Sequence, residues 1–215
     1  MKSNRRNFIK MAGLAGVGIA GSGMILGCSS RKPEKTLADM KVAYIREETA
    51  EDKYLKYAQK AKEDNFPKLA IMITAISKAE NIHGKNHKKV LDKLKGNYPA
   101  SPVGSYEVKT TLENLQEAYK AEKYESDEMY PAFIKQANEE NVPEAVESFT
   151  WAWQVEKQHM GYYNIGITAL GTKSELSMPE KWYVCPKCGG TYAEADAKNT
   201  CYFDPTPKEQ FFEFK

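Results

Sequence analysis

The motif Glu-x-x-His occurs twice in this chain of 215 residues, inside a longer internal repeat. Glu80 and His83 form the first copy, and Glu156 and His159 form the second at an offset of 76 residues. Flanking residues repeat at the same offset, pairing Tyr54 with Tyr130, Tyr57 with Phe133 and Ala61 with Ala137. Residues three apart share one face of a helix, so each copy presents a carboxylate and an imidazole together. The repeat predicts two helical hairpins that form a four-helix bundle around a dimetal site.

Such a site needs a further carboxylate from each of the other two helices. Glu47 lies 33 residues before the first motif, and Glu122 and Glu125 lie 34 and 31 residues before the second. Buried like charges on one helix face repel unless a cation lies between them. The predicted ligands are Glu47, Glu80, His83, Glu122, Glu125, Glu156 and His159. Carboxylate oxygen mixed with imidazole nitrogen suits iron or manganese.

A single Glu-x-x-His on a soluble helix is usually a pair of surface residues, so the metal interpretation depends on the duplication. The remaining acidic residues of these helices are predicted to be solvated charges: Glu48, Glu51, Glu63, Glu117, Glu128, Glu139 and Glu140. His87 lies one helical turn after His83, close enough to contact the groups around a metal, but is predicted to be exposed.

Through these segments the chain resembles the rubrerythrins, members of the ferritin-like diiron superfamily. The matching segments are residues 47–61, 80–83, 122–133 and 156–159. The resemblance implies two iron ions at a diiron-oxo site. It implies that Glu125 exchanges with His83 as a ligand when one iron changes oxidation state. It also implies that Tyr54 and Tyr130 hydrogen-bond to the carboxylates, a role that is compatible with packing inside the bundle.

The rest of the bundle follows from helix and turn signals. Helices are predicted at about residues 37–63, 67–95, 110–140 and 143–170, with a crossover at 96–106. Asn65 is predicted as the N-cap of the second helix, and residues 110–113 as a capping box that opens the third. Pro131 is expected to bend or loosen the third helix, and Gly171 to cap the fourth. The predicted fold is an all-α, ferritin-like bundle over residues 37–171.

The first 28 residues resemble a twin-arginine export signal that ends in a lipobox. Arg5 and Arg6 precede a glycine-rich apolar run, and Cys28 is the predicted lipidation site, followed by a linker at residues 29–36. The alternative is a short anchor helix that is not cleaved. The expected product is a lipoprotein that is anchored on the periplasmic or cell-surface side of a bacterial membrane.

Removal of residues 1–27 changes the charge balance. It takes away four basic residues, so 31 basic residues become 27 against 29 acidic ones, and the net charge changes from +2 to −2. No basic excess remains that would indicate a nucleic-acid partner. Lipidation of one of the four cysteines leaves three, an odd number that argues against a disulfide framework.

The tail at residues 180–215 carries a second metal motif. Cys185 and Cys188 form a Cys-x-x-Cys-Gly knuckle, and Cys201 and Asp204 have the spacing of a second one with aspartate in the fourth position. Rubrerythrins carry a rubredoxin-like domain here, in which four cysteines bind one iron. We consider three alternatives for these residues: one iron ion, one structural zinc ion, or no metal.

The resemblance implies a peroxidase that reduces hydrogen peroxide to water in oxidative-stress defence. Electrons would come from an unidentified donor, as in an NADH-peroxidase system, and pass through the tail if it holds iron. The resemblance also implies a homodimer. The alternatives are a membrane-tethered iron-binding protein or ferroxidase of ferritin type, and a structural lipoprotein without metal.

Overall fold

A computed structural model describes residues 32–100, 102–173 and 177–215. The predicted export signal and its lipidation site Cys28 lie outside the described residues. Residues 33–215 form one compact unit. Among the described residues, none of the helices combines the length and the apolar character needed to cross a membrane.

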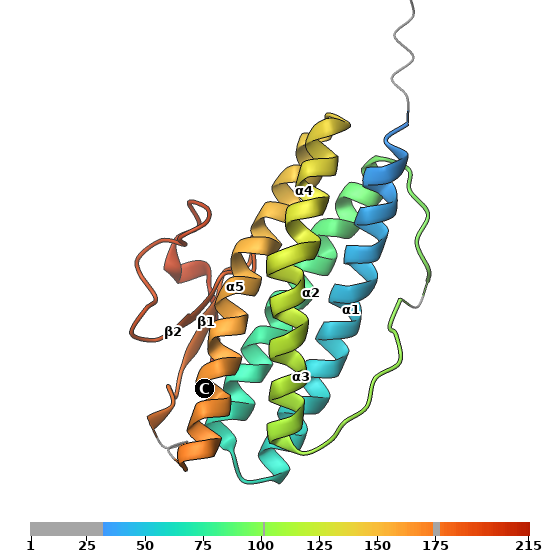
Figure 1. Cartoon of the computed structure of the whole chain (residues 1–215). Coiled ribbons are helices and arrows are strands. Elements are labelled where there is room, and N and C mark those ends of the chain that lie inside the picture. Colours follow the sequence, from blue (N-terminus) through green and yellow to red (C-terminus); the bar gives the residue numbers. More distant parts are fainter. Residues whose placement is uncertain (1–31, 101, 174–176) are drawn as a thin grey trace, which may run out of the picture. The chain divides into compact units, whose positions relative to one another are not determined.

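The prediction of a four-helix bundle is confirmed (Figure 1). The helical elements are α1 (Glu34–Glu63), α2 (Pro67–Lys93), α3 (Thr111–Tyr124), the π-helical turn η1 (Glu125–Met129), α4 (Tyr130–Glu139) and α5 (Pro143–Thr172). α1 and α2 form the first hairpin, and α3, η1 and α4 together form the rod that pairs with α5 in the second. α1 begins inside the segment that we predicted as a linker.

The turn inside each hairpin shows the internal repeat at the level of the backbone. Asn65 and Asn141, which are related by the 76-residue offset, have positive φ angles of 65° and 56°. Asparagine tolerates this left-handed conformation better than most residues, and it reverses the chain after a helix. The prediction of Asn65 as an N-cap is therefore wrong, because Phe66 takes that position before α2.

The predicted capping box is confirmed at the start of α3. The Thr110 hydroxyl accepts from the Glu113 amide, and the Glu113 carboxylate accepts from the Thr110 amide. The prediction of Gly171 as a C-cap is wrong. α5 continues to Thr172, and the left-handed residue that ends it is Lys173, with φ 55°.

The irregularity expected near Pro131 is the π-helical turn η1, which directly precedes it. Pro131 has no amide hydrogen, so the preceding carbonyls must find other donors. The Tyr130 amide donates to the Glu125 carbonyl across the wider turn. The Trp153 indole nitrogen donates to the Ser126 carbonyl at 2.8 Å. α5 thus supplies a hydrogen bond that the proline cannot make.

Two apolar clusters fill the bundle, one toward each end. One cluster contains Tyr54, Leu69 and Ile76, and the other contains Met40 and Phe149. Along each rod, the predicted glutamate ligands fall where residues of one cluster give way to residues of the other. The fold therefore encloses a polar layer between two apolar regions.

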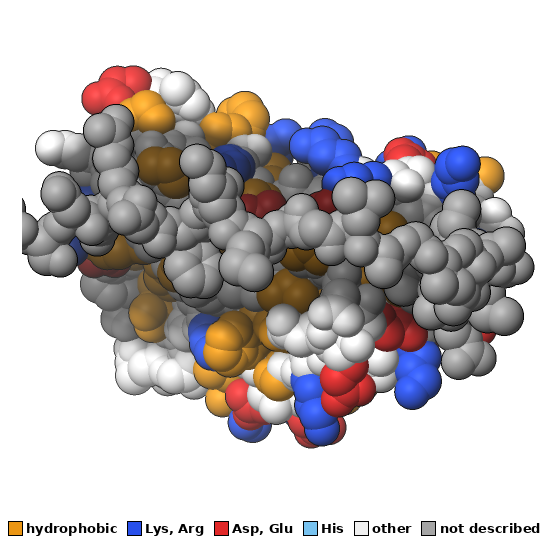
Figure 2. Space-filling view, turned by 90° about the horizontal axis from the view of Figure 1, so that it is seen from above, with side chains coloured by type: hydrophobic (Ala, Val, Ile, Leu, Met, Phe, Trp, Pro, Cys, Tyr) orange, Lys and Arg blue, Asp and Glu red, His pale blue; other side chains and the backbone are white. Residues whose placement is uncertain are grey.

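The tail is a small domain that packs on the bundle. Its strands β1 (Trp182–Val184), β2 (Thr191–Ala193) and β3 (Phe212–Phe214) form an antiparallel sheet in the order β2-β1-β3, with a 3₁₀ turn η3 (Lys208–Gln210). The sheet and the cysteine knuckle fit the predicted rubredoxin-like domain, and the strands contact α2. On the face seen in Figure 2, charges of both signs are interspersed among the described side chains.

Candidate metal centres

Six of the seven predicted bundle ligands converge in the buried polar layer. They form two overlapping groups, in each of which one potential ligand atom per residue lies within 4.8 Å of the others. The first group is Glu47, Glu80, His83 and Glu156, and the second is Glu80, Glu122, Glu156 and His159. Glu80 and Glu156 belong to both groups, so these two carboxylates lie between two potential metal positions. All six side chains are buried.

Each histidine turns its Nδ1 atom toward these shared carboxylates. His83 Nδ1 lies 3.0 Å from Glu80 Oε2 and 2.9 Å from Glu156 Oε1. His159 Nδ1 lies 3.0 Å from Glu80 Oε1 and 2.9 Å from Glu156 Oε2. The other ring nitrogen of His83 lies 3.1 Å from the Cys188 carbonyl, which can only accept. His83 Nε2 therefore carries the proton, and a neutral ring presents a lone pair at Nδ1.

The same argument fixes the tautomer of His159. Its Nε2 lies 3.1 Å from the Thr191 hydroxyl, and that hydroxyl already donates to the Gly189 carbonyl. Thr191 therefore accepts from His159 Nε2, which leaves a lone pair at Nδ1. In the neutral form of both rings, the Nδ1 lone pairs face carboxylate oxygens at about 3 Å. A cation between them removes this repulsion, and these are the tautomers that bind metal.

The carboxylates give independent support for cations at this place. Four buried oxygens among the described residues have no hydrogen-bond partner of acceptable geometry although they face the layer: Glu47 Oε2, Glu80 Oε1, Glu122 Oε2 and Glu156 Oε1. Burial, and next the charge of Glu156, raises the pKa of Glu122 well above its usual range. Burial and the charge of Glu80 do the same to the pKa of Glu156. The donor set fits two divalent cations, which would keep these groups ionised.

Two tyrosines hold the carboxylates that are not shared. The Tyr54 hydroxyl donates to Glu122 Oε1 at 2.5 Å, and the Tyr130 hydroxyl donates to Glu47 Oε1. In each of these glutamates the tyrosine donates to Oε1, and Oε2 is the oxygen without a hydrogen-bond partner. The tyrosines therefore orient Glu122 and Glu47 so that one oxygen of each remains available to a cation.

Glu125 is the predicted ligand that the structure leaves outside both groups. It begins the turn η1, and its Oε1 atom lies 2.6 Å from both Nε and Nη2 of Arg46. Burial, with the charge of Glu47 as the next cause, raises the pKa of Glu125 to about 7 in spite of this ion pair. Glu125 is thus a buried carboxylate beside the polar layer, and the guanidinium group of Arg46 holds it there.

The prediction that His87 is exposed is wrong. His87 has no exposed surface, and it lies between the Ser148 hydroxyl, 2.8 Å from Nδ1, and the Tyr130 hydroxyl, 3.1 Å from Nε2. Ser148 belongs to α5, so the burial of His87 depends on a partner distant in sequence. The repeat offered a signal, because His87 and the buried Tyr163 are related by the same 76-residue offset.

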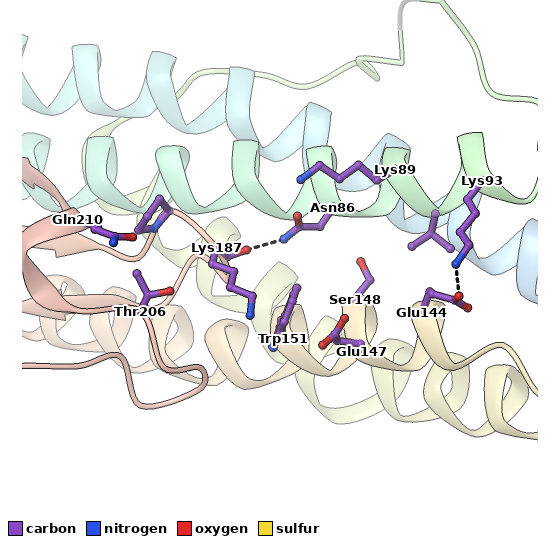
Figure 3. Close-up of a pocket in the computed structure, with 12 residues that line it drawn as sticks. Asn86, Lys89, Lys93, Glu144, Glu147, Ser148, Trp151, Lys187, Thr206 and Gln210 are labelled. Atoms are coloured by element: carbon purple, nitrogen blue, oxygen red, sulfur yellow. Dashed lines mark hydrogen bonds and ion pairs between the residues drawn. The ribbon is translucent and has the colours of Figure 1, made fainter.

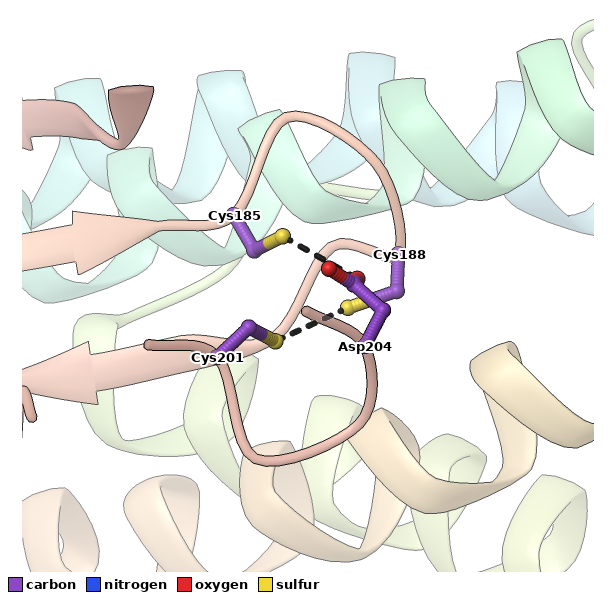
Figure 4. Close-up of side chains that lie close together, drawn as sticks. All are labelled: Cys185, Cys188, Cys201 and Asp204. Atoms are coloured by element: carbon purple, nitrogen blue, oxygen red, sulfur yellow. Dashed lines mark hydrogen bonds between the residues drawn. The ribbon is translucent and has the colours of Figure 1, made fainter. Parts of the chain in front are cut away.

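The tail residues Cys185, Cys188, Cys201 and Asp204 form a third group, with potential ligand atoms within 4.8 Å of one another (Figure 4). Asp204 Oδ2 lies 3.3 Å from Cys185 Sγ, and Cys188 Sγ lies 3.4 Å from Cys201 Sγ. All three cysteines are free and buried. Backbone amides donate to two of the sulfurs, from Gly190 to Cys188 and from Phe203 to Cys201. The group is able to hold one metal ion.

The knuckle contacts the bundle site directly. Gly189 follows Cys188 with a φ of 81°, and a Cβ atom at this position would lie 2.5 Å from His83 Nε2. Only glycine combines this backbone conformation with so close an approach. The contact brings the Cys188 carbonyl within hydrogen-bonding distance of His83, so the two candidate metal centres share a hydrogen bond.

Comparisons with known proteins agree with this arrangement. The sequence profile of the rubrerythrin family matches residues 40–164. Rubrerythrin-2 of Clostridium acetobutylicum is 29% identical over 187 residues, which cover 86% of this chain and 100% of the relative. Nigerythrin of Nitratidesulfovibrio vulgaris is 30% identical over 178 residues, which cover 82% and 85%.

Solved structures of nigerythrin resemble this chain over most of its length. The mixed-valence form gives a TM-score of 0.75 at 28% identity, covering 83% of this chain and 86% of that one. The fully reduced form, in which all the iron is ferrous, gives a TM-score of 0.74 at 29% identity with the same coverage.

Proposed function

This chain belongs to the rubrerythrin family, and from that premise we propose that it reduces hydrogen peroxide to water at a pair of iron ions. The observation that carries the proposal is the convergence of four unpartnered carboxylate oxygens and two imidazole lone pairs on one buried layer. The ferrous iron of the related nigerythrin supports iron as the metal. Reduction of peroxide to two water molecules consumes two electrons and two protons.

The proposed ligands divide into two sets. Glu47 and His83 would hold one ion and Glu122 and His159 the other, with Glu80 and Glu156 shared between them. Two ferrous ions bound here would supply the two electrons that the reaction consumes. The protein orients Glu47 and Glu122 through their tyrosines, and the apolar clusters on either side restrict the entry of water.

We also infer a role for Glu125, from the exchange with His83 that the rubrerythrin resemblance implies. In this structure His83 lies inside the ligand layer while Glu125 pairs with Arg46. This is the arrangement expected when His83 is the ligand. Arg46 would then hold the alternative carboxylate beside the layer.

Electrons would return through the tail if its four-ligand group holds iron. The hydrogen bond from His83 to the Cys188 carbonyl gives a direct contact between the two centres. Zinc would make the tail structural instead, since zinc has no accessible redox change. A thiolate-to-iron absorption band that persists in Glu80→Ala but disappears in Cys188→Ala would assign iron to the tail.

We propose, from the sequence alone, that Cys28 carries a lipid and that the chain is exported to the outer side of a bacterial membrane. Metabolic labelling with a radioactive fatty acid tests this, because Cys28→Ser should abolish the label and release the protein from the membrane fraction. The homodimer that the rubrerythrin resemblance implies can be tested by sedimentation of the purified protein.

The test of the reaction is anaerobic stopped-flow mixing of the iron-loaded, reduced protein with peroxide and, separately, with oxygen. Peroxide should oxidise the iron faster than oxygen does. Glu122→Ala should abolish the fast phase, whereas Glu117→Ala, a partly exposed position on the same helix that lies outside both groups, should retain it. Faster reaction with oxygen, together with uptake of far more iron than two centres can hold, would favour the alternative of a ferritin-type iron binder.

A further inference from the structure

A groove between α2, α5 and the tail domain leads to Ser148. It has a volume of about 510 Å³, and exposed side chains such as Lys89, Glu147 and Lys187 line it, so it is open to solvent. Figure 3 shows Ser148 on α5 with its hydroxyl toward the groove, opposite Lys89 on α2. Ser148 connects this groove to His87, because its hydroxyl lies 2.8 Å from His87 Nδ1.

A continuous chain of hydrogen bonds runs from Ser148 to Glu47 in the polar layer. The Tyr130 hydroxyl donates to Glu47 Oε1, which as a carboxylate can only accept. His87 Nε2, 3.1 Å from the Tyr130 oxygen, must therefore donate to it. A neutral imidazole that carries its proton on Nε2 accepts at Nδ1, and there the Ser148 hydroxyl donates at 2.8 Å. All three donors point in one direction, from the groove to Glu47.

The other half of the repeat lacks this continuation. The pair formed by Tyr54 and Glu122 corresponds to the pair formed by Tyr130 and Glu47. By the 76-residue offset, however, the residue equivalent to His87 is Tyr163, and the residue equivalent to Ser148 is Met72. The Tyr163 hydroxyl is buried without a hydrogen-bond partner among the described residues, so no chain to the surface starts there. The path is a specific addition to one half of a duplicated structure.

We propose that Ser148, His87 and Tyr130 form a proton path from the solvent-filled groove to Glu47 Oε1. The inference rests on the proposed function, because peroxide reduction consumes protons inside a buried layer. In one passage a hydronium ion in the groove gives its excess proton to Ser148 and leaves as water, each member passes its own proton to the next, and Glu47 receives the last one. No electrons move along the path, and rotation of the hydroxyl groups with tautomer exchange at His87 restores it.

The test measures exchange of buried protons with solvent by NMR in the full-length protein, loaded with zinc in place of iron and labelled at histidine and tyrosine. The variants are Ser148→Thr and Ser148→Val, which have nearly the same shape but differ in the hydroxyl group. The His87 Nε2 proton should exchange rapidly in the native protein and in Ser148→Thr. In Ser148→Val it should become as slow as the Tyr54 hydroxyl proton, which serves as the internal control.

Equal exchange at His87 in the two variants would overturn the proposal. The measurement uses neither iron nor peroxide, so it succeeds or fails independently of the peroxidase assignment. In iron-loaded protein, Ser148→Val should also slow oxidation by peroxide, on the order of 10²-fold for loss of a positioned proton-transfer group. Ser148→Thr should retain the native rate, and a Thr variant as slow as the Val variant would show that altered packing, not the hydroxyl, is responsible.

Discussion

At the residue scale, Glu125 is a buried carboxylate whose protonation affects the stability of the fold. Its pKa in the folded protein is about 7, against 4.5 for an unperturbed glutamate, chiefly because it is buried. Between these two pH values the folded state keeps a proton that the unfolded state has lost. Stability that depends on Glu125 is therefore present below about pH 4.5 and is lost as the pH rises toward 7.

We predict that Glu125→Gln stabilises the metal-free protein at pH 8 by up to about 3 kcal/mol, from a raised pKa of about 7. The substitution should have little effect at pH 4, where both states already hold the proton. Urea denaturation of the metal-free protein at the two pH values measures the difference. Glu128→Gln, at an exposed position of the same turn, is the control and should change neither value.

A second prediction for a single residue concerns Gly189. Gly189→Ala places a Cβ atom 2.5 Å from His83 Nε2 in a residue whose φ is 81°. We expect it to lower the free energy of unfolding by about 1–3 kcal/mol. Gly161→Ala on α5 is the control. Its Cβ would meet nothing within 4 Å, so it should stabilise the helix by about 0.5–1 kcal/mol. Equal effects in urea denaturation would contradict this account.

What the sequence could predict about the site depended on helix spacing. Residues three apart on one helix face must point together, and for that reason Glu80 and His83 could be grouped without coordinates. The ion pair of Glu125 with Arg46 and the burial of His87 depend on side chains of other helices. Spacing along one helix carries no information about which residue of a neighbouring helix faces it. Ligation by the grouped residues stays a prediction until the metal is measured.

At the scale of elements, the turn η1 depends on a tryptophan of another helix, Trp153 on α5. The Ser126 carbonyl has no donor from its own helix, because Pro131 lacks an amide hydrogen, and the Trp153 indole supplies one. We predict that Trp153→Phe lowers the free energy of unfolding by about 1–3 kcal/mol, the cost of an unsatisfied buried carbonyl. Differential scanning calorimetry measures the change.

Trp151→Phe is the matched control for this prediction. Trp151 lies two residues away on α5, is also partly buried, and lines the groove, where it makes no hydrogen bond to η1 among the described residues. It should lose only some contact area, so its destabilisation should be smaller than that of Trp153→Phe. A loss that is equal in both variants would indicate packing as the common cause and would exclude the hydrogen bond as the reason.

Helix ends were less predictable from sequence than helix positions. The capping box at Thr110 could be foreseen because both of its partners lie within four residues. The role of Glu140 could not, since it accepts from the Thr36 amide at 2.8 Å and so caps α1 from a position 104 residues later in the sequence. Gly171 failed as a cap because α5 continues past it. A helix end could therefore be predicted from the sequence only where the residues that cap it lie close to it in the chain.

At the scale of the whole molecule, the tail and the bundle are joined at the polar layer. His83 bonds to the Cys188 carbonyl, and His159 bonds to the Thr191 hydroxyl. Both hydrogen bonds leave from the Nε2 atoms and so fix the tautomers that present Nδ1 to the carboxylates. If the tail group binds a metal, loss of that metal should leave these two acceptors less firmly held. The two centres should therefore be linked in their metal affinities.

We predict that Cys201→Ser, which removes one ligand of the tail group, weakens binding of the bundle metals. Couplings of this kind are typically about 5–150-fold in affinity. Competition with a chelator during anaerobic titration of ferrous iron measures the affinity, with Lys198→Ala as a control at an exposed tail position that touches neither group. Linkage is reciprocal, so Glu156→Ala in the bundle should weaken the tail metal by a comparable factor. If Cys201→Ser and Lys198→Ala bind the bundle metals equally well, the contact between His83 and the knuckle transmits no free energy, and the tail is an independent domain that only rests against the site.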